Sequence, residues 1–232
     1  MNKLEQLYEG KAKKVYSTED PNVVIASYKD DATAFDGAKK GTITGKGAIN
    51  NQMSNYLMQQ LEKVGVPTHF VEELSERETA VKKVSIVPLE VIVRNISAGH
   101  FASNYGVKEG IVFDEPTIEF SYKNDDLHDP LINDYHAVAL KLATWDEIDL
   151  IKQSAFQVND CLKKTLAECG FTPVSYTHLD VYKRQPPQLR HLYSSGHRRP
   201  RHRTCHPAGF EGGRPGGTGR LQCHLGRRGL HQ

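Results

Sequence analysis

The chain has 232 residues, 38% of them hydrophobic, and a formal net charge of +2 at pH 7. This is enough apolar material for one large domain or two small ones, and no apolar run approaches the roughly 18 residues of a membrane-spanning helix. The N-terminal segment lacks the apolar stretch of a secretory signal, and the four cysteines show no CxxC spacing. The composition therefore predicts a soluble, cytoplasmic protein.

The small net charge conceals an abrupt change in composition near residue 174. Residues 1–173 carry 17 Lys, 2 Arg and 26 acidic side chains, whereas residues 186–232 carry nine Arg, no Lys and one acidic side chain. A polybasic arm has little reason to exclude Lys, because both cations bind phosphate. Residues 174–185 also resemble a translated adapter sequence. We therefore expect residues 174–232 to be a non-native, disordered tail rich in Arg, Gly and His.

The first expected elements are two strands over residues 7–16, separated by a tight turn at Gly10. Lys11 and Lys13 follow the turn, and both ammonium groups and free backbone N–H groups favour anions. The segment predicts either a loop that closes over the phosphates of a nucleotide or a surface hairpin with solvated lysines. It matches neither the Walker loop nor GxGxxG.

A strand at residues 23–28 and a loop at residues 30–37 are expected next. In that loop Asp36 is either a turn former or a substrate ligand. A helix over residues 48–64, ended by Gly65, is predicted by side chains that recur at spacings of three and four, namely Ile49, Met53, Tyr56, Leu57, Gln60, Leu61 and Val64. Short strands follow at residues 66–73 and 79–83, and Lys82 in the second either faces a nucleotide pocket or is exposed.

The central stretch of the sequence is residues 86–100, IVPLEVIVRNISAGH. Its β-period alternation places Glu90 and Arg94 on one face of a strand. Because burial of a bare charge is costly, each side chain is expected to meet a partner or a polar ligand. Free N–H groups at the turn around Gly99 would complete an anion-binding site with Arg94. The alternative is an internal Glu–Arg ion pair on the face of the sheet.

Beyond this strand the sequence predicts a short helix at residues 98–105 and strands at residues 107–113 and 117–122. Residues 123–130, KNDDLHDP, combine three carboxylates, an imidazole and an ammonium group. Such a loop suits a divalent cation or a polar substrate, and equally a solvated acidic loop. The last expected element is a helix over residues 145–169, which begins with a capping box of Thr144 and Glu147 and ends at Gly170.

Six of these segments, in this order, resemble the SAICAR synthetases over residues 1–170: GKAKKVY, TAFDG, GKGAINN, VPLEVIVRN, SAGH and KNDDLHDP. The resemblance implies an α+β, two-lobed fold with ATP between the lobes and with its C-terminal strands and helices truncated. The smaller, β-rich, nucleotide-binding lobe would comprise residues 1–84. The larger α+β lobe, incomplete here, would comprise residues 85–173.

The reaction that the resemblance implies is a step of de novo purine biosynthesis. ATP converts the carboxylate of 5-amino-1-(5-phosphoribosyl)imidazole-4-carboxylate to an acyl phosphate, and the amine of L-aspartate then displaces phosphate. The implied cofactors are ATP and Mg²⁺, and the implied partners are small-molecule substrates, with a homo-oligomer as a further option. Catalysis is expected from positioning and charge neutralisation.

The resemblance also implies roles for individual side chains. Lys11 and Lys82 are the expected catalytic residues, and Asp129 is the expected metal ligand. The expected ATP-binding residues are Gly10, Lys11, Ala12, Lys13, Lys82 and Glu90. The expected substrate-binding residues are Asp36, Arg94, Gly99, His100 and Asp129.

Two features depart from the family pattern. His100 stands where the family has a Ser that would hydrogen-bond the substrate phosphate, so binding is expected to depend more strongly on pH. Segments resembling DFKLEFG and DExSPD, which would bring a catalytic lysine, metal-binding carboxylates and a phosphate-binding Arg, do not occur in residues 174–232. We therefore expect this polypeptide to be inactive or nearly so.

Two other functional classes stay open at this point. A nucleic-acid-binding protein would use the basic tail, although residues 1–173 are net acidic. A kinase-like phosphotransferase would act on a hydroxyl group, although HRD and DFG motifs are absent from the sequence. A zinc site in the tail would lack the usual finger spacing, and it would be formed by Cys205, His206, Cys223 and His224.

Overall fold

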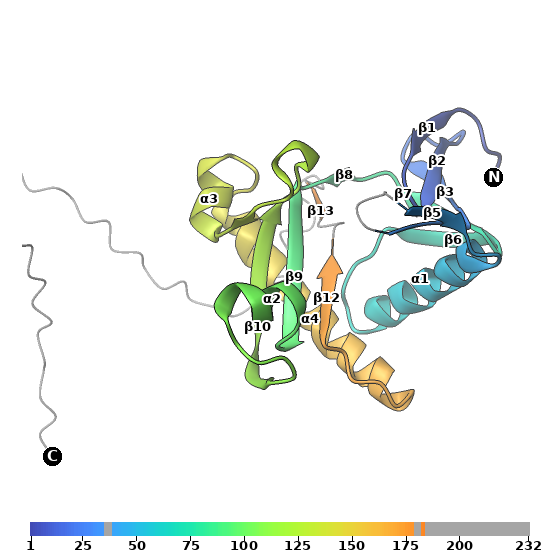
Figure 1. Cartoon of the computed structure of the whole chain (residues 1–232). Coiled ribbons are helices and arrows are strands. Elements are labelled where there is room, and N and C mark those ends of the chain that lie inside the picture. The colour runs from blue at the N-terminus through green and yellow to red at the C-terminus, as the bar shows by residue number, and fades with distance from the viewer. Residues whose placement is uncertain (35–38, 179–181, 184–232) are drawn as a thin grey trace, which may run out of the picture. The chain divides into compact units, whose positions relative to one another are not determined.

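Two antiparallel sheets, one following the other along the chain, form the framework of the fold (Figure 1). This computed structural model describes residues 1–34, 39–178 and 182–183, all of them in the unit that spans residues 1–187. The described chain combines helices with antiparallel strands, so the predicted α+β class is confirmed.

The first sheet has five strands in the order β1-β2-β3-β7-β6. Its strands are β1 (Gln6–Glu9), β2 (Lys13–Ser17), β3 (Val23–Tyr28), β6 (Phe70–Ser75) and β7 (Glu78–Lys82). Helix α1 (Lys46–Lys63) contacts β3, β6 and β7. Between β3 and α1, the segment expected to be a loop begins instead as a strand, because β4 (Asp31–Ala34) pairs with β5 (Lys39–Thr42).

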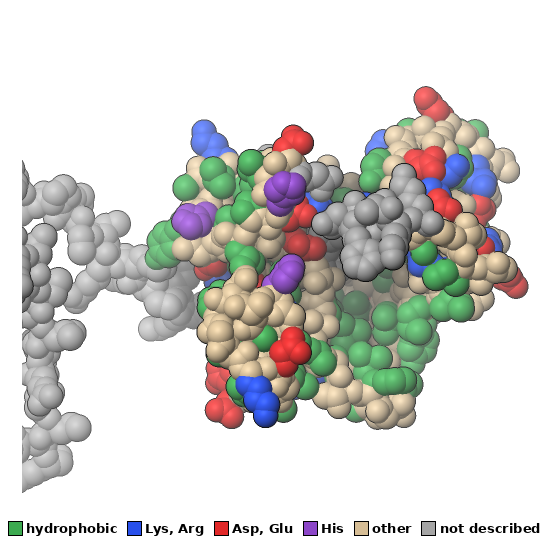
Figure 2. Space-filling view, in the orientation of Figure 1, with side chains coloured by type: hydrophobic (Ala, Val, Ile, Leu, Met, Phe, Trp, Pro, Cys, Tyr) green, Lys and Arg blue, Asp and Glu red, His purple; other side chains and the backbone are tan. Residues whose placement is uncertain are grey.

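Helix α1 buries two polar side chains, whereas several of the apolar side chains that mark its periodicity are exposed and Leu61 near its end is buried. Ile49, Met53 and Tyr56 are at least half exposed, whereas Asn51 and Asn55 are 0% and 2% exposed. Figure 2 shows hydrophobic side chains gathered on the surface over this helix. The helix was predicted correctly, and the side that it turns toward the first sheet carries the two buried asparagines, whose hydrogen-bond partners lie on that sheet.

The second sheet has four strands in the order β11-β10-β9-β12. Its strands are β9 (Leu89–Ile96), β10 (Val112–Tyr122), β11 (Leu131–Ile132) and β12 (Ser175–His178). The remaining elements are α2 (Gly99–Tyr105), the 3₁₀ turn η1 (Asp125–Leu127), α3 (Asp134–Ala139), α4 (Trp145–Glu168) and the short pair β8 (Ser85–Ile86) and β13 (Tyr182–Lys183).

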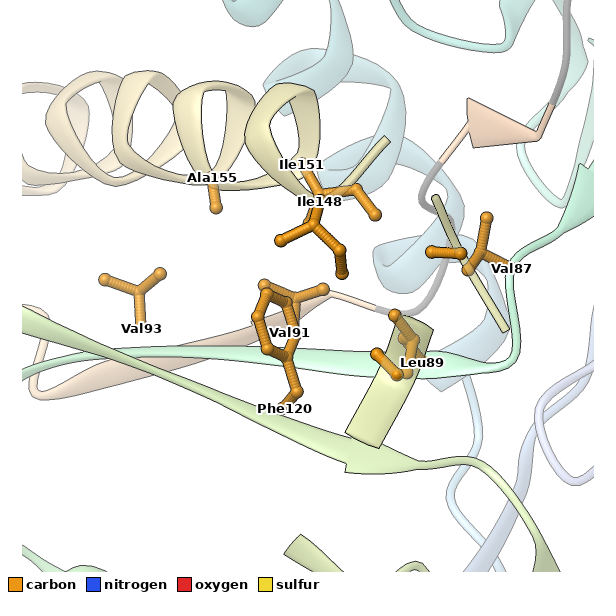
Figure 3. Close-up of a cluster of buried hydrophobic side chains, with 10 residues drawn as sticks. Val87, Leu89, Val91, Val93, Phe120, Ile148, Ile151 and Ala155 are labelled. Carbon is orange, nitrogen blue, oxygen red and sulfur yellow. The ribbon is translucent and has the colours of Figure 1, made fainter. Parts of the chain in front are cut away.

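Strand β9 alternates strictly between buried and half-buried side chains. Leu89, Val91 and Val93 are fully buried and face α4, where Figure 3 shows them packed beneath Ile148 and Ile151. The opposite face carries the four half-buried side chains of the strand, which are Glu90, Ile92, Arg94 and Ile96. The predicted alternation, with these two charged residues on one face, is confirmed.

Strand β10 is continuous where the sequence indicated two strands. Its pairing with β9 shifts between Val112, opposite Ile96, and Thr117, opposite Arg94. A bulge of this kind accommodates extra residues, here the segment that contains Pro116, without ending the strand. The two expected strands are therefore one element with an irregularity.

Strand β12 lies within the segment that we expected to be disordered. It pairs antiparallel with β9, and Tyr176 packs against the hydrophobic core while its hydroxyl donates to the Ala155 carbonyl. A reciprocal amide pair between Asn95 and Asn159, with both N–O distances 2.9 Å, lies beneath the start of this strand. Four tail residues thus belong to the sheet, while residues 179–181 and 184–232 lie outside the described residues.

Candidate functional site

A hollow of about 670 Å³ lies beside the turn between β1 and β2. Its lining is formed by the turn, the end of β3 and the β4–β5 hairpin, and consists of Tyr8, Glu9, Gly10, Lys11, Lys29, Asp31, Ala32, Gly41 and Thr42. The volume falls within the usual range of about 300–1,000 Å³ for small-molecule sites. Of the expected ATP-binding residues, Gly10 and Lys11 line this hollow.

The β1–β2 turn is closed by backbone hydrogen bonds. The Gly10 N–H donates to the Lys13 carbonyl at 2.9 Å, and the Ala12 carbonyl accepts from the Lys29 N–H at 2.8 Å. A Cβ at Gly10 would lie 3.0 Å from the Tyr8 ring, so the turn is tightly packed there. Lys11 is exposed and makes no ion pair with any residue that the structure describes, whereas Lys13 is half-buried in β2.

The other cation of the lining is fully engaged. The Lys29 ammonium lies 2.7 Å from a Glu9 carboxylate oxygen and 2.6 Å from an Asp31 carboxylate oxygen. Hydrogen bonds to Asp31 and Glu9 raise the pKa of Lys29, and the hydrogen bond from Lys29 lowers the pKa of Glu9. The hollow therefore contains two carboxylates, one bridging ammonium and one ammonium free to meet a ligand.

The base of the hairpin is fixed to α1 through Asp30. Its two carboxylate oxygens accept from the Arg77 guanidinium at 2.7 and 2.8 Å, and also from the N–H groups of Gly47 at 2.8 Å and Gly45 at 3.3 Å. A Cβ at Gly47 would lie 2.7 Å from the Tyr28 carbonyl oxygen. The two glycines of the GKGAINN motif thus allow the start of α1 to approach β3 and Asp30 closely.

Lys82 and Glu90 lie apart from the lining of the hollow. Lys82 is exposed at the end of β7, and its ammonium donates to the Thr68 carbonyl at 3.2 Å. Glu90 is half-buried on β9 opposite Ser121, with no ion pair among the described residues. These two expected ATP-binding residues are not among those that line the hollow.

Arg94 forms an ion pair, but its partner is Glu119 of β10 rather than Glu90. The Arg94 Nε lies 3.2 Å from both Glu119 carboxylate oxygens, and each side chain is only 13% exposed. The guanidinium also lies over the Phe101 ring, 6.0 Å from its centroid. The sequence predicted on which face of β9 Arg94 lies. Its partner, Glu119, is placed beside it by the register between β9 and β10.

The turn after Arg94 already binds a carboxylate. The Gly99 N–H donates to Glu109 at 2.8 Å, so this amide has an anionic partner as expected for the start of a helix. His100 is exposed, and its carbonyl accepts from the Ser103 hydroxyl at 3.1 Å. Arg94, Gly99 and His100 thus follow one another at the end of β9 and the start of α2.

Asp129 is held in an unusual backbone conformation, since His128 and Asp129 both have positive φ, 56° and 47°. Its carboxylate accepts from the Lys123 ammonium at 2.5 Å and from the Asn124 N–H at 2.8 Å. The hydrogen bond from Lys123 lowers the pKa of Asp129, and the positive charge of Lys11 adds to the shift. Lys11 of the turn and Asp129 of the acidic loop are therefore electrostatically coupled.

Several expectations find no site within the described chain. No group of three or more His, Cys, Asp or Glu side chains that would hold a metal occurs among the described residues. Asp36 and the four Cys and His residues of the considered zinc site lie outside those residues. No helix in the described part is long and apolar enough to cross a bilayer.

The sequence analysis did not single out Lys29 and Asp31, which line the hollow. The available signal was the run Lys29-Asp30-Asp31 at the end of a well-predicted strand, where polar side chains frequently belong to a site. It also missed Glu119, because nothing in a single sequence fixes which residue of a neighbouring strand lies beside Arg94.

Comparisons with known proteins bear on this arrangement. The SAICAR synthetase family matches residues 6–174. The phosphoribosylaminoimidazole-succinocarboxamide synthase of Lachnoclostridium phytofermentans is 61% identical over 176 residues, which cover 76% of this chain and 75% of that protein.

Two solved structures are similar in fold. The phosphoribosylaminoimidazole-succinocarboxamide synthase of Ehrlichia chaffeensis superimposes with a TM-score of 0.73 at 36% identity, covering 77% of this chain and 79% of the other. A SAICAR synthetase in complex with ADP gives a TM-score of 0.70 at 44% identity, with coverages of 73% and 72%.

Proposed function

The chain belongs to the SAICAR synthetase family, and we propose that it binds ATP in the hollow beside Gly10 and Lys11. The family consists of ligases of purine biosynthesis that join L-aspartate to the imidazole ribonucleotide carboxylate with ATP. This membership favours a carboxylate–amine ligase over the nucleic-acid-binding and kinase-like alternatives.

The observation that supports the proposal most directly is that Lys11 lines the hollow without an ion-pair partner among the described residues. It lines a hollow of nucleotide size and, among the described residues, makes no ion pair, so its ammonium is available to a polyphosphate. A related protein of known structure is a complex with ADP, which supports a nucleotide as the ligand. Lys13, on the strand that leaves the turn, is the second cation proposed to serve the phosphates.

Lys82 and Glu90 are proposed to contact the nucleotide beyond the hollow itself. Both are accessible in part, and Glu90 has no ion-pair partner among the described residues. Lys82 forms a single long hydrogen bond to a backbone carbonyl, at 3.2 Å, which a stronger anionic partner would replace.

Mg²⁺ is proposed to accompany the nucleotide. Mg²⁺ in such sites takes one or two protein carboxylates together with substrate phosphates and water, so a single carboxylate fits this pattern. Asp129 would provide it, since its lowered pKa keeps the carboxylate ionised and Lys11 is close enough to influence it. When bound, the metal supplies neutralisation of phosphate charge.

Arg94, Gly99 and His100 are proposed to bind the phosphate of the imidazole ribonucleotide. Glu119 accepts from the Nε of Arg94, and among the described residues the hydrogen bonds of this guanidinium are those of Nε. The exposed His100 imidazole would donate to phosphate most strongly when protonated. Asp36 is proposed to contact the same substrate from the segment between β4 and β5.

The chemistry proposed for these residues is positioning and charge neutralisation. A carboxylate oxygen of the ribonucleotide attacks the terminal phosphorus of ATP and ADP leaves. The aspartate amine then attacks the acyl carbon, phosphate leaves, and the nitrogen loses a proton to give the amide. The ammonium groups of the lysines and the guanidinium group of Arg94 stabilise the negative charge of the phosphates in both steps.

Equilibrium binding of ADP, measured by calorimetry, tests the nucleotide site. Lys11→Met is expected to raise the Kd about tenfold or more, because a charge-assisted hydrogen bond is worth roughly 1.5–3 kcal/mol. Lys164→Met, on the exposed surface of α4, is expected to leave the Kd unchanged within about twofold, since distant surface charges are screened. Equal affinities of the parent chain and Lys11→Met would contradict the proposal.

That this polypeptide does not catalyse the ligase reaction stays a prediction. With ATP, L-aspartate and the ribonucleotide carboxylate, we expect no succinocarboxamide from residues 1–232, as followed by chromatography. Formation of the product at the rate of a full-length relative would show that the prediction of inactivity is wrong.

A further inference from the structure

Lys29 occupies a position in the hollow that the proposed function does not yet explain. It lies at the end of β3, where its ammonium is 2.7 Å from Glu9 and 2.6 Å from Asp31. Its side chain is 21% exposed, less than that of either carboxylate partner at 41% and 50%. Lys29 lines the hollow, but its side chain is less exposed than the two carboxylate side chains that its ammonium contacts.

Lys29 also contacts the phosphate-binding turn through its backbone. Its N–H donates to the Ala12 carbonyl at 2.8 Å, while its side chain reaches Glu9 on the other arm of the same turn. Asp31, its second partner, is the first residue of β4. One residue thus links both arms of the β1–β2 turn to the hairpin that forms the opposite wall of the hollow.

The charges of the lining give this linkage a chemical consequence. The described lining contains the cations Lys11 and Lys29 and the anions Glu9 and Asp31. Without the Lys29 ammonium, the carboxylates of Glu9 and Asp31 would face the phosphates of a nucleotide. Within the described lining, Lys11 would then be the only positive charge to offset their negative charge. Like charges in a partly desolvated site repel strongly, so such a hollow would disfavour a polyphosphate.

We propose that Lys29 is a positioning residue of the nucleotide site, which neutralises Glu9 and Asp31 so that the phosphates of the nucleotide can approach Lys11. This inference rests on the proposed nucleotide-binding function. It assigns Lys29 no contact with the ligand, and the carboxylates, rather than the phosphates, are its partners.

The test is ADP binding by calorimetry to the full chain and to variants at this cluster. Lys29→Met is expected to weaken binding about tenfold or more, because it leaves both carboxylates uncompensated. Lys29→Arg keeps the charge and is expected to bind within about threefold of the parent. Lys14→Met is the matched control, since Lys14 lies 3.4 Å from Glu9 but does not line the hollow, and an exposed pair of this kind contributes little.

A charge-rescue variant distinguishes three possible roles of Lys29: neutralising the two carboxylates, contacting phosphate directly, and stabilising the structure only. Lys29→Met combined with Asp31→Asn restores the lining charge and is expected to recover most of the lost affinity. Asp31→Asn alone adds one net positive charge and is expected to bind ADP more tightly than the parent. This single variant keeps the test decisive even when Lys29→Met does not fold.

The outcomes distinguish this inference from the function on which it rests. If the parent chain binds no ADP, the proposed function fails and the inference fails with it. If the parent binds and Lys29→Met binds equally well, only the inference is overturned. A double variant no better than Lys29→Met, or an Asp31→Asn variant weaker than the parent, also overturns it, because Lys29 would then act by contact or by structure alone.

A second readout does not require nucleotide. The hydrogen bond from Lys29 lowers the pKa of Glu9 in the parent. In Lys29→Met the midpoint of the Glu9 carboxyl carbon resonance, followed by NMR, is expected to move to higher pH. An unchanged midpoint would show that Lys29 does not neutralise this carboxylate.

Discussion

At the scale of single residues, the Asp30 carboxylate connects three segments of the chain around the first sheet. It accepts hydrogen bonds from the Arg77 guanidinium between β6 and β7 and from the N–H groups of Gly45 and Gly47 at the start of α1. The hydrogen bonds from Arg77, and then from Gly47, hold the pKa of Asp30 well below its usual range. A carboxylate with a depressed pKa stabilises the folded state as long as it is ionised.

The sign of the resulting pH dependence follows from the direction of that shift. Because the pKa of Asp30 is lower in the folded chain, its contribution is present above the unfolded-state pKa of about 3.9 and is lost as the pH falls further. Asp30→Asn is therefore expected to lower the urea midpoint clearly at pH 6 and by a smaller amount at pH 3. A matched control is Asp114→Asn, at an exposed position of β10.

Equal effects of Asp30→Asn at the two pH values would contradict the coupling between the ionised carboxylate and Arg77. The Asp114→Asn control is expected to leave the urea midpoint nearly unchanged at both pH values, because exposed surface substitutions usually stay within about 0.5 kcal/mol.

Single residues also show what the sequence predicted and what it could not. The alternation of Leu89, Val91 and Val93 identified the face of β9 that carries Arg94, since a strand has a period of two. The partner of Arg94 is 25 residues away, on β10, at a register set by a bulge around Pro116. Pattern fixes a face, but pairing across strands depends on contacts that no local pattern encodes.

At the scale of elements, α1 shows how tertiary partners override periodicity. Its buried side is a polar network in which the Thr79 hydroxyl lies 2.6 Å from Asn51 Oδ1 and 2.9 Å from Asn55 Oδ1. The Asn51 amide also donates to the carbonyls of Ser75 and Glu76. A satisfied network of this kind tolerates burial of amides, which the apolar pattern of the helix does not indicate.

A pair of substitutions on α1 tests this orientation. Asn51→Leu is expected to lower the free energy of unfolding by about 2–3 kcal/mol, because it leaves the Ser75 and Glu76 carbonyls without their amide donor and removes one of the two acceptors of the Thr79 hydroxyl. Ile49→Gln, at a position 62% exposed, is expected to change it by no more than about 0.5 kcal/mol. Urea denaturation measures both.

The opposite order of effects would show that the apolar stripe, rather than the asparagine face, packs against the sheet. The helix boundaries themselves were predictable, since Gly65 follows the last turn and no Pro or Gly interrupts residues 48–63. Which side of the helix faces inward was not, because its partners lie on strands 18 to 28 residues further along the chain.

At the scale of the whole molecule, the change in composition near residue 174 does not coincide with the end of the folded unit. The family match ends at residue 174, yet β12 continues the sheet by pairing with β9. Tyr176 packs against the hydrophobic core between β9 and α4 and against a smaller cluster of Leu61, Val66 and Val158, and burial raises the pKa of its hydroxyl. Whatever the origin of these residues, they cover an edge of β9 that would otherwise be unpaired.

Two shortened chains separate the contribution of β12 from that of the segment beyond it. A chain that ends at residue 187 keeps every described element and is expected to unfold at the same temperature as the full chain. A chain that ends at Val174 loses β12 and the contacts of Tyr176, so it is expected to unfold several degrees lower, as 1 kcal/mol is worth roughly 2–4 °C in a domain of this size. It is also expected to aggregate, because the edge of β9 becomes available to other chains.

Calorimetry and light scattering measure these outcomes. Equal unfolding temperatures for the chains ending at 174 and 187 would show that β12 adds nothing to the sheet. Tyr176→Ala in the full chain removes the buried ring while keeping the strand, and is expected to lie between the two, since the ladder of β12 and β9 remains. We therefore expect the highest unfolding temperature for the full chain, a lower one for Tyr176→Ala and the lowest for the chain that ends at Val174. The first difference would measure the contribution of the Tyr176 side chain, and the second that of the strand pairing.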